Sequence, residues 1–154
     1  MRGALARLVH AAPGIRSGPT GAPTSTGPRR VLLIGGGGRE HALAWRILRD
    51  RPESTFCVVP DTDSFGAAAT LLSISWRDVE GIVDWCRTER PDLVIVGGCS
   101  PLRIGLVDRL REAGVPVLGA TRDAARIEWS KRYGAEVAVA AGVPMPRSWW
   151  FAGA

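Results

Sequence analysis

The feature that most constrains this chain is a short apolar run followed at once by four glycines. Residues 31–34 read Val-Leu-Leu-Ile, and an uninterrupted apolar run of this kind is typical of a parallel strand that is covered on both faces. Residues 35–38 are all glycine, and the residues after them place Leu43, Ile47 and Leu48 on one side of a predicted helix at residues 39–49. A strand, a glycine-rich turn and a helix in this order open a βαβ unit, so the sequence predicts an α/β fold.

The same alternation continues along the chain. Apolar runs predict further strands at residues 56–59, 71–74, 93–96 and 115–118. Apolar residues at helical spacing predict helices at residues 78–89, 102–113 and 122–141. Pro116 places the last strand at an edge of the sheet, because proline cannot donate a hydrogen bond to a neighbouring strand. Together these elements predict an open, Rossmann-like parallel sheet with helices on both faces and right-handed crossovers.

The charges separate a basic N-terminal tail from a neutral remainder. The formal net charge is +5, and residues 1–30 hold five arginines and no acidic residue, so residues 31–154 hold 15 basic and 15 acidic side chains. A neutral domain lacks the clustered basic face that a phosphate backbone requires, so no nucleic-acid partner is expected. No apolar run approaches the roughly 20 residues of a membrane-spanning helix, so no membrane segment is expected.

We expect residues 1–30 to be a disordered tail and residues 31–154 to form one domain. The tail contains nine glycine or proline residues and too little apolar surface to offset the entropy of ordering it. Its composition fits an organelle transit peptide, and an extension from an upstream start codon would look the same. Cys57, Cys86 and Cys99 form no CxxC pair and have no histidine at metal-ligand spacing. Neither a disulfide framework nor a metal site is therefore expected, and the cytoplasm is the expected compartment.

Ligands of open parallel sheets bind at the carboxyl ends of the strands, which here are the loops at residues 35–38, 61–64, 97–102 and 119–121. The first loop predicts an anion site, because glycines allow close backbone approach and the start of a helix supplies unpaired N–H groups. A tight turn that binds nothing is the alternative. The dinucleotide fingerprint G-x-G-x-x-G fails, because Glu40 or His41 stands where the third glycine belongs, and we interpret both side chains as structural. The candidate phosphate-binding residues are Gly36, Gly37, Gly38 and Arg39.

Two later loops carry weaker signals. Asp61 stands where a dinucleotide fold holds a ribose hydroxyl, although aspartate is also common in turns. Cys99 follows another predicted strand, as a nucleophile would, but no histidine lies beside it in the sequence, and an inert loop residue is the better interpretation. The sequence assigns no residue a catalytic role.

Residues 31–45 resemble the opening strand, loop and helix of the phosphoribosylamine–glycine ligase family, whose members are also called glycinamide ribonucleotide synthetases. That family usually reads G-N-G-G-R-E-H-A-L-A-W, and here Gly36 stands at the Asn. The resemblance covers about residues 31–151 and is carried, in family order, by residues 91–97, 100–102, 105–108 and 128–131. Three family features differ: the P-G-N loop is replaced by residues 60–64, a substrate-facing glutamate by Cys99, and the glycine of G-S-K by Trp129.

The resemblance implies the N-terminal substrate-binding domain that precedes the ATP-grasp part of these ligases. It implies that the glycine loop lies near the phosphate of the phosphoribosyl substrate and that Lys131 lies near ATP. It also implies a second substrate loop with Asp61, Gly97, Ser100 and Pro101. The complete ligase joins glycine to 5-phosphoribosylamine in purine biosynthesis with ATP and Mg²⁺. As a truncated, split or diverged copy, this chain is expected to bind no cofactor alone and to be inactive alone.

Two alternatives remain open from the sequence. The chain could be a stand-alone nucleotide-binding or dinucleotide-binding module, with Asp61 on a ribose hydroxyl, or an inactive remnant without a ligand. The apolar cluster of Trp149, Trp150 and Phe151 predicts an interaction surface for a separate ATP-grasp chain or for a second copy of this chain. Trp129 is expected to extend that surface.

Overall fold

Five parallel strands form one open sheet in the order β3-β2-β1-β4-β5. The computed structural model describes residues 29–59, 65 and 69–151, so Asp61 and nearly all of the expected tail lie outside the described residues. The strands are β1 (Arg30–Ile34), β2 (Thr55–Val59), β3 (Thr70–Leu71), β4 (Leu93–Val96) and β5 (Val117–Leu118). The predicted fold class is confirmed, and β5 occupies an edge of the sheet, as Pro116 indicated.

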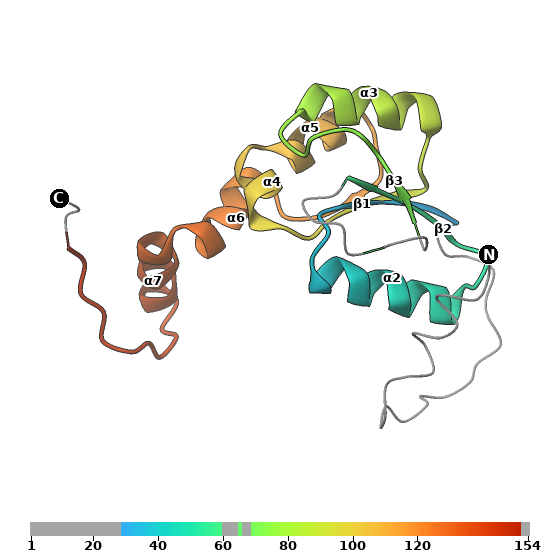
Figure 1. The fold of residues 1–154 in the computed structure, drawn as a ribbon. Coiled ribbons are helices and arrows are strands. Elements are labelled where there is room, and N and C mark those ends of the chain that lie inside the picture. The colour runs from blue at the N-terminus through green and yellow to red at the C-terminus, as the bar shows by residue number, and fades with distance from the viewer. Residues whose placement is uncertain (1–28, 60–64, 66–68, 152–154) are drawn as a thin grey trace.

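Helices cover both faces of the sheet (Figure 1), with α2 (Gly38–Asp50) on one face and α3 (Val79–Glu89) and α5 (Leu106–Glu112) on the other. The side chains of β1 alternate between these faces. Val31 and Leu33 pack in a cluster with Ala44 of α2, whereas Leu32 joins the cluster on the opposite side. Because both faces of β1 are covered, its apolar side chains are fully buried.

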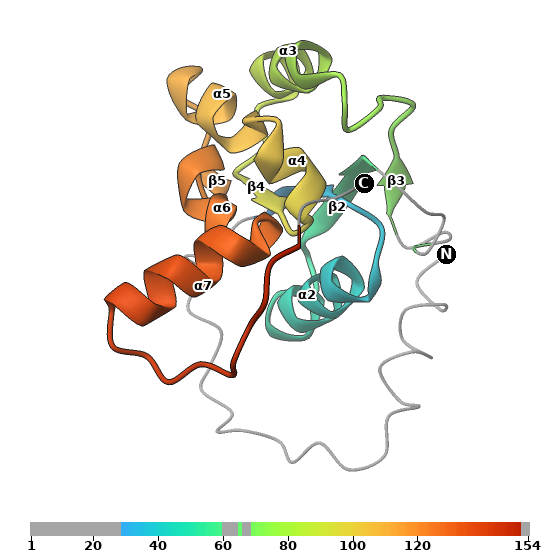
Figure 2. The ribbon, with the colours of Figure 1, turned by 90° about the vertical axis from the view of Figure 1, so that its left-hand side faces the viewer.

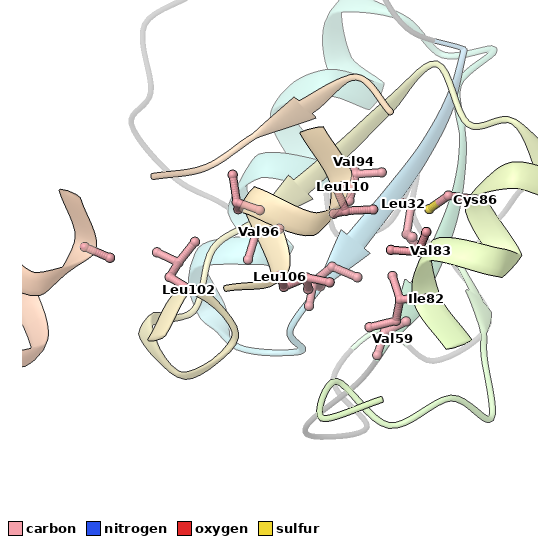
Figure 3. Close-up of a cluster of buried hydrophobic side chains, with 13 residues drawn as sticks. Leu32, Val59, Ile82, Val83, Cys86, Val94, Val96, Leu102, Leu106 and Leu110 are labelled. Atoms are coloured by element: carbon pink, nitrogen blue, oxygen red, sulfur yellow. The ribbon is translucent and has the colours of Figure 1, made fainter. Parts of the chain in front are cut away.

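The larger cluster fixes α3 and α5 on the sheet, as Figure 3 shows. Ile82, Val83 and Cys86 come from α3, and Leu106 and Leu110 come from α5. The helical spacing that predicted α3 is confirmed. The helix begins after Asp78, whose carboxylate accepts a hydrogen bond from the Gly81 N–H group at 2.9 Å.

Two helices that the sequence predicts as continuous are each broken in the structure. The predicted helix at residues 102–113 forms as α4 (Cys99–Arg103) and α5, because Gly105 between them adopts a left-handed φ of 82°. The predicted helix at residues 122–141 forms as α6 (Arg122–Trp129) and α7 (Lys131–Ala140). Ser130 separates them with extended backbone angles, and its hydroxyl accepts a hydrogen bond from the Tyr133 N–H group at 3.3 Å. A capping serine therefore starts a second helix within a segment that periodicity alone predicts to be a single continuous helix.

The last helix and the segment after it lie apart from the sheet. Helix α6 still contributes Ala125 to the larger apolar cluster, whereas Figures 1 and 2 show α7 extending from the body of the domain, followed by the segment at residues 141–151. Helix α7 packs against α6 and contains no buried residue, and every residue from 141 to 151 is exposed. None of the described helices is long and apolar enough to cross a membrane.

Candidate functional site

The strand order reverses between β1 and β4, and a cavity opens at this point. The chain leaves β1 to form α2 on one face of the sheet, whereas it leaves β4 to form α4 and α5, the latter on the opposite face. The cavity has a volume of about 230 Å³ and is lined by Gly35, Trp76, Gly98, Cys99, Ser100 and Pro101. Ligands of open α/β sheets bind where the order reverses, so the cavity is the candidate binding site.

Part of the predicted second substrate loop is at this cavity. Ser100 and Pro101 line it, and Gly97 directly precedes the lining residues at the end of β4. Asp61 lies outside the described residues. Lys131 is exposed at the start of α7 and is not among the cavity-lining residues, so the structure does not bring it together with the other candidates.

The predicted phosphate loop lies beside the cavity. Gly36 and Gly37 connect β1 to α2, and Gly38 and Arg39 form the first turn of that helix, where both are exposed. A Cβ atom added at Gly38 would meet no atom within 4 Å, so the space around this helix start is open. Arg39 forms no ion pair with any described residue, which leaves its guanidinium group available to an anion. The start of α2 therefore offers N–H groups, a positive helix end and a free arginine.

Glu40 is buried and His41 is half-buried against Phe65, which agrees with their interpretation as structural residues. Only 5% of Glu40 is exposed, and its carboxylate accepts a hydrogen bond from the Gly37 N–H group at 3.0 Å. The His41 ring meets the Phe65 ring edge-on, with the ring centroids 5.4 Å apart.

Trp76 is a cavity-lining residue that sequence reasoning missed. It lies between β3 and α3, and the Arg77 guanidinium group stacks on it at 4.2 Å from the ring centroid. The loop after the third predicted strand, at residues 71–74, was not among the four loops expected to bind a ligand. Strand β3 ends at Leu71 and Trp76 follows its carboxyl end, so this segment belongs to the same group of loops.

The three cysteines are free thiols in different environments. Burial raises the pKa of the Cys86 thiol to about 11, and burial also raises the pKa of Cys57 above its ordinary value. Cys99 is half-buried in the cavity wall. Among the described residues, no three His, Cys, Asp or Glu side chains are grouped so as to hold a metal ion.

Trp129 points into the fold, and the expectation that it extends the C-terminal aromatic surface is wrong. The indole packs against the larger apolar cluster, beneath the Arg103 guanidinium group at 5.0 Å from the ring centroid. Its Nε1 atom is buried and has no hydrogen-bond partner among the described residues.

A family model described as "Phosphoribosylglycinamide synthetase, N domain" matches residues 29–128. The chain belongs to this family. A phosphoribosylamine–glycine ligase of Rhizobium meliloti is 38% identical over 115 residues, and one of Mycobacterium leprae is 40% identical over 119 residues. These alignments cover 75% and 77% of this chain but only 27% and 28% of the two ligases. The family resemblance inferred from the sequence is thus confirmed, and the matched region is about a quarter of the length of these two ligases.

The family domain also occurs within larger proteins. The trifunctional purine biosynthetic protein adenosine-3 of Homo sapiens is 36% identical over 117 residues, which are 75% of this chain and 12% of that protein. Among solved structures, RSP, a Rex-family repressor, is similar at a TM-score of 0.43 and 16% identity, covering 73% of this chain and 62% of that one. A likeness this weak says nothing about a ligand.

Proposed function

We propose that this domain binds the phosphoribosyl substrate of a phosphoribosylamine–glycine ligase in purine biosynthesis. One observation carries the proposal: the glycine block of the family starts α2 beside the cavity where the strand order reverses. Two independent features of a ligand site, a helix start with open space around Gly38 and a cavity, therefore lie next to each other.

The two features suit the two halves of a sugar phosphate. The phosphate would accept hydrogen bonds from the N–H groups at the start of α2 and pair with the Arg39 guanidinium group. The sugar would enter the cavity, where Ser100 supplies a hydroxyl group and Trp76 an aromatic wall. The domain would thus hold the substrate in place while other residues perform the chemistry.

The transfer step is assigned to the ATP-grasp part of a ligase of this family. That reaction converts ATP, glycine and 5-phosphoribosylamine to glycinamide ribonucleotide, ADP and phosphate. ATP and Mg²⁺ would be held by that part, and the role of this domain would be to bind the phosphoribosyl substrate. We place the domain in the cytoplasm, which three free thiols support.

The test is a binding measurement with one informative variant and one matched control. Ribose 5-phosphate and glycinamide ribonucleotide should bind the full chain in calorimetry, whereas NAD should not. Gly38→Val should weaken binding at least tenfold, because the new side chain enters the open space at the helix start without striking the fold. Ala42→Val, at an exposed position one turn further along α2, should bind as the wild type does. Equal affinity of both variants would refute the phosphate site, and tight NAD binding would favour a dinucleotide-binding module.

Thiol reactivity gives a second readout of the same site. Cys99 lines the cavity, so bound ribose 5-phosphate should slow its alkylation, whereas Cys57, on β2, should react at an unchanged rate. Unchanged alkylation of Cys99 at saturating ligand would place the ligand elsewhere.

The partner of this domain is proposed to be an ATP-grasp part that covers the C-terminal elements. A groove of about 420 Å³ lies between α7 and the segment after it, and side chains such as Val139, Met145 and Trp150 line it. Trp149 and Phe151 are 69% and 90% exposed nearby. An apolar surface of this kind is typical of a protein contact, and the matched ligases continue well beyond the region that they share with this chain.

Sedimentation distinguishes the proposed partner from self-association. An ATP-grasp fragment of a matched ligase should co-sediment with the wild-type chain but not with the double variant Trp149→Ser/Trp150→Ser. The variant Leu71→Ser, at an exposed position on β3, is the control and should still bind. A wild type that forms dimers without the fragment, and loses them in the double variant, would show that a second copy covers this surface instead.

A further inference from the structure

The buried carboxylate of Glu40 lies between the two loops that border the cavity. Glu40 is in the first turn of α2, and its Oε2 atom accepts the Gly37 N–H hydrogen bond at 3.0 Å, back across the start of the helix. With 5% of its surface exposed, the side chain is turned into the fold instead of toward the open space around Gly38.

Three glycines make room for this one side chain. A Cβ atom added at Gly35 would lie 3.1 Å from Glu40 Cδ, and one added at Gly37 would lie 3.2 Å from Oε2. A Cβ atom added at Gly97 would lie only 1.9 Å from Oε1. Gly35 and Gly37 belong to the loop after β1, whereas Gly97 belongs to the loop after β4. Glu40 therefore packs against both loops at the point where the strand order reverses.

The same two loops form one side of the candidate site. Gly35 and the residues that follow Gly97 line the cavity, and Gly37 immediately precedes the helix start that is proposed to bind phosphate. A side chain that fixes the spacing of these loops also fixes the distance between the phosphate site and the sugar cavity.

We propose that Glu40 is a positioning residue, whose carboxylate holds the β1–α2 loop and the β4–α4 loop together so that both loops can contact one bound sugar phosphate. The inference rests on the proposed function for the identity of the ligand. Glu40 does not contact the ligand in this arrangement; it acts through Gly37 and Gly97. The glycine-rich loop then serves two purposes, because some of its glycines admit a ligand and others admit Glu40.

Three substitutions separate the effect of the length of the Glu40 side chain from the effect of its charge. Glu40→Asp keeps the acid but shortens it by one methylene group, so it should lose the contact with both loops. Glu40→Gln keeps the length and an oxygen acceptor for the Gly37 N–H group, so it should preserve the arrangement. Glu40→Ala removes both the charge and the oxygen acceptor for the Gly37 N–H group. If Glu40 acted on a phosphate only through its charge, the ranking would differ, because Gln and Ala would both bind an anion more tightly and Asp would resemble the wild type.

The experiment combines amide exchange with ligand titration on the ¹⁵N-labelled full chain. Exchange of the Gly37 N–H group should be slow in the wild type and in Glu40→Gln, and at least tenfold faster in Glu40→Asp and Glu40→Ala. The affinity for ribose 5-phosphate should stay within threefold in Glu40→Gln and fall at least tenfold in the other two. Glu128→Ala, at an exposed position on α6, is the control and should change neither quantity.

The outcomes separate this inference from the proposed function. Unchanged Gly37 exchange in Glu40→Ala, or wild-type affinity in Glu40→Asp, would overturn the positioning role. A wild type that binds no ribose 5-phosphate would instead overturn the proposed function, and the amide exchange of Gly37 would still decide whether Glu40 holds the loop. Far-UV circular dichroism of each variant verifies that it is folded at the assay temperature.

Discussion

Adding one methyl group at Gly97 is the most direct test of the packing around Glu40. The new Cβ atom would lie 1.9 Å from Glu40 Oε1, and real Cβ contacts are essentially never under 3.0 Å, so the carboxylate would have to move. Gly97 does not have a positive φ, so its backbone would accept alanine without strain. The expected loss of stability therefore comes from the displacement of the Glu40 carboxylate and from the loss of the hydrogen bond that it accepts from the Gly37 N–H group.

The magnitude follows from three contributions. Loss of a hydrogen bond to a charged group costs about 1.5–3 kcal/mol. Overpacking of a tight site costs about 1–3 kcal/mol. Restriction of the unfolded chain by alanine offsets about 0.4–1 kcal/mol of this. We therefore expect Gly97→Ala to lower the free energy of unfolding by about 3 kcal/mol, which for a domain of this size is a fall in Tm of roughly 12 °C.

Urea unfolding followed by circular dichroism measures this effect in a double-mutant cycle. Glu40→Ala removes the atoms that the new methyl group would strike, so adding Gly97→Ala to Glu40→Ala should cost little more than Glu40→Ala alone. Gly98→Ala is the matched control, because its Cβ atom would meet Pro101 Cδ at an ordinary 3.4 Å. If Gly97→Ala is as stable as Gly98→Ala, or if its effect simply adds to that of Glu40→Ala, the reasoning is refuted.

Three further predictions concern pH, thiol chemistry and helix packing. The backbone N–H group of Arg30, and after it that of Arg29, donates a hydrogen bond to Asp92 and holds the pKa of this carboxyl group below its ordinary 3.8. The stability that the carboxylate contributes is therefore present above pH 3.8 and is lost as the pH falls through the lower pKa of the folded state. Asp92→Asn should accordingly make the unfolding free energy less steep at acid pH, and an unchanged slope would count against this bond. Because burial raises the pKa of Cys86 to about 11, its thiol should react with a disulfide reagent at pH 8 much more slowly than Cys99 does, and the two rates should become equal in denaturant. Gly134→Ala should reduce helicity and speed proteolysis within α7, because the new Cβ atom would lie 2.5 Å from a backbone oxygen of α6; protection equal to that of the wild type would contradict the packing.

The local pattern of apolar residues in the sequence was sufficient to predict strand β1 and the helix α3 that packs on the sheet. The apolar run at residues 31–34 predicts a strand that is covered on both faces, and β1 buries all four of those side chains. The spacing of the apolar residues in α3 predicts the face that it presents to the sheet, and that face is buried. These features could be predicted because an uninterrupted apolar run indicates a strand that is buried on both faces, and helical spacing indicates which face of a helix is buried.

Element boundaries depended on details that periodicity does not record. Gly105 divides one predicted helix through its left-handed backbone, and Ser130 divides another by capping α7. Both residues were visible in the sequence, but their neighbours continue the apolar spacing, so only the folded chain shows that the helix axis changes there. Trp76, which lines the cavity, was missed for another reason: the loop after the third predicted strand was left out of the loops expected to bind a ligand.

The sequence alone determined the fold class, the family block around the glycine loop and the neutrality of the domain, because each of these depends on residue types and on their order. The tertiary structure decided which strands are neighbours, and through this it decided the site. Only the pairing of β1 with β4 brings Gly97 against Glu40 and places Ser100 beside Gly35. The reason is physical: a glycine in a sequence shows that a side chain is absent, but what occupies the vacant space is set by contacts between segments that are distant along the chain.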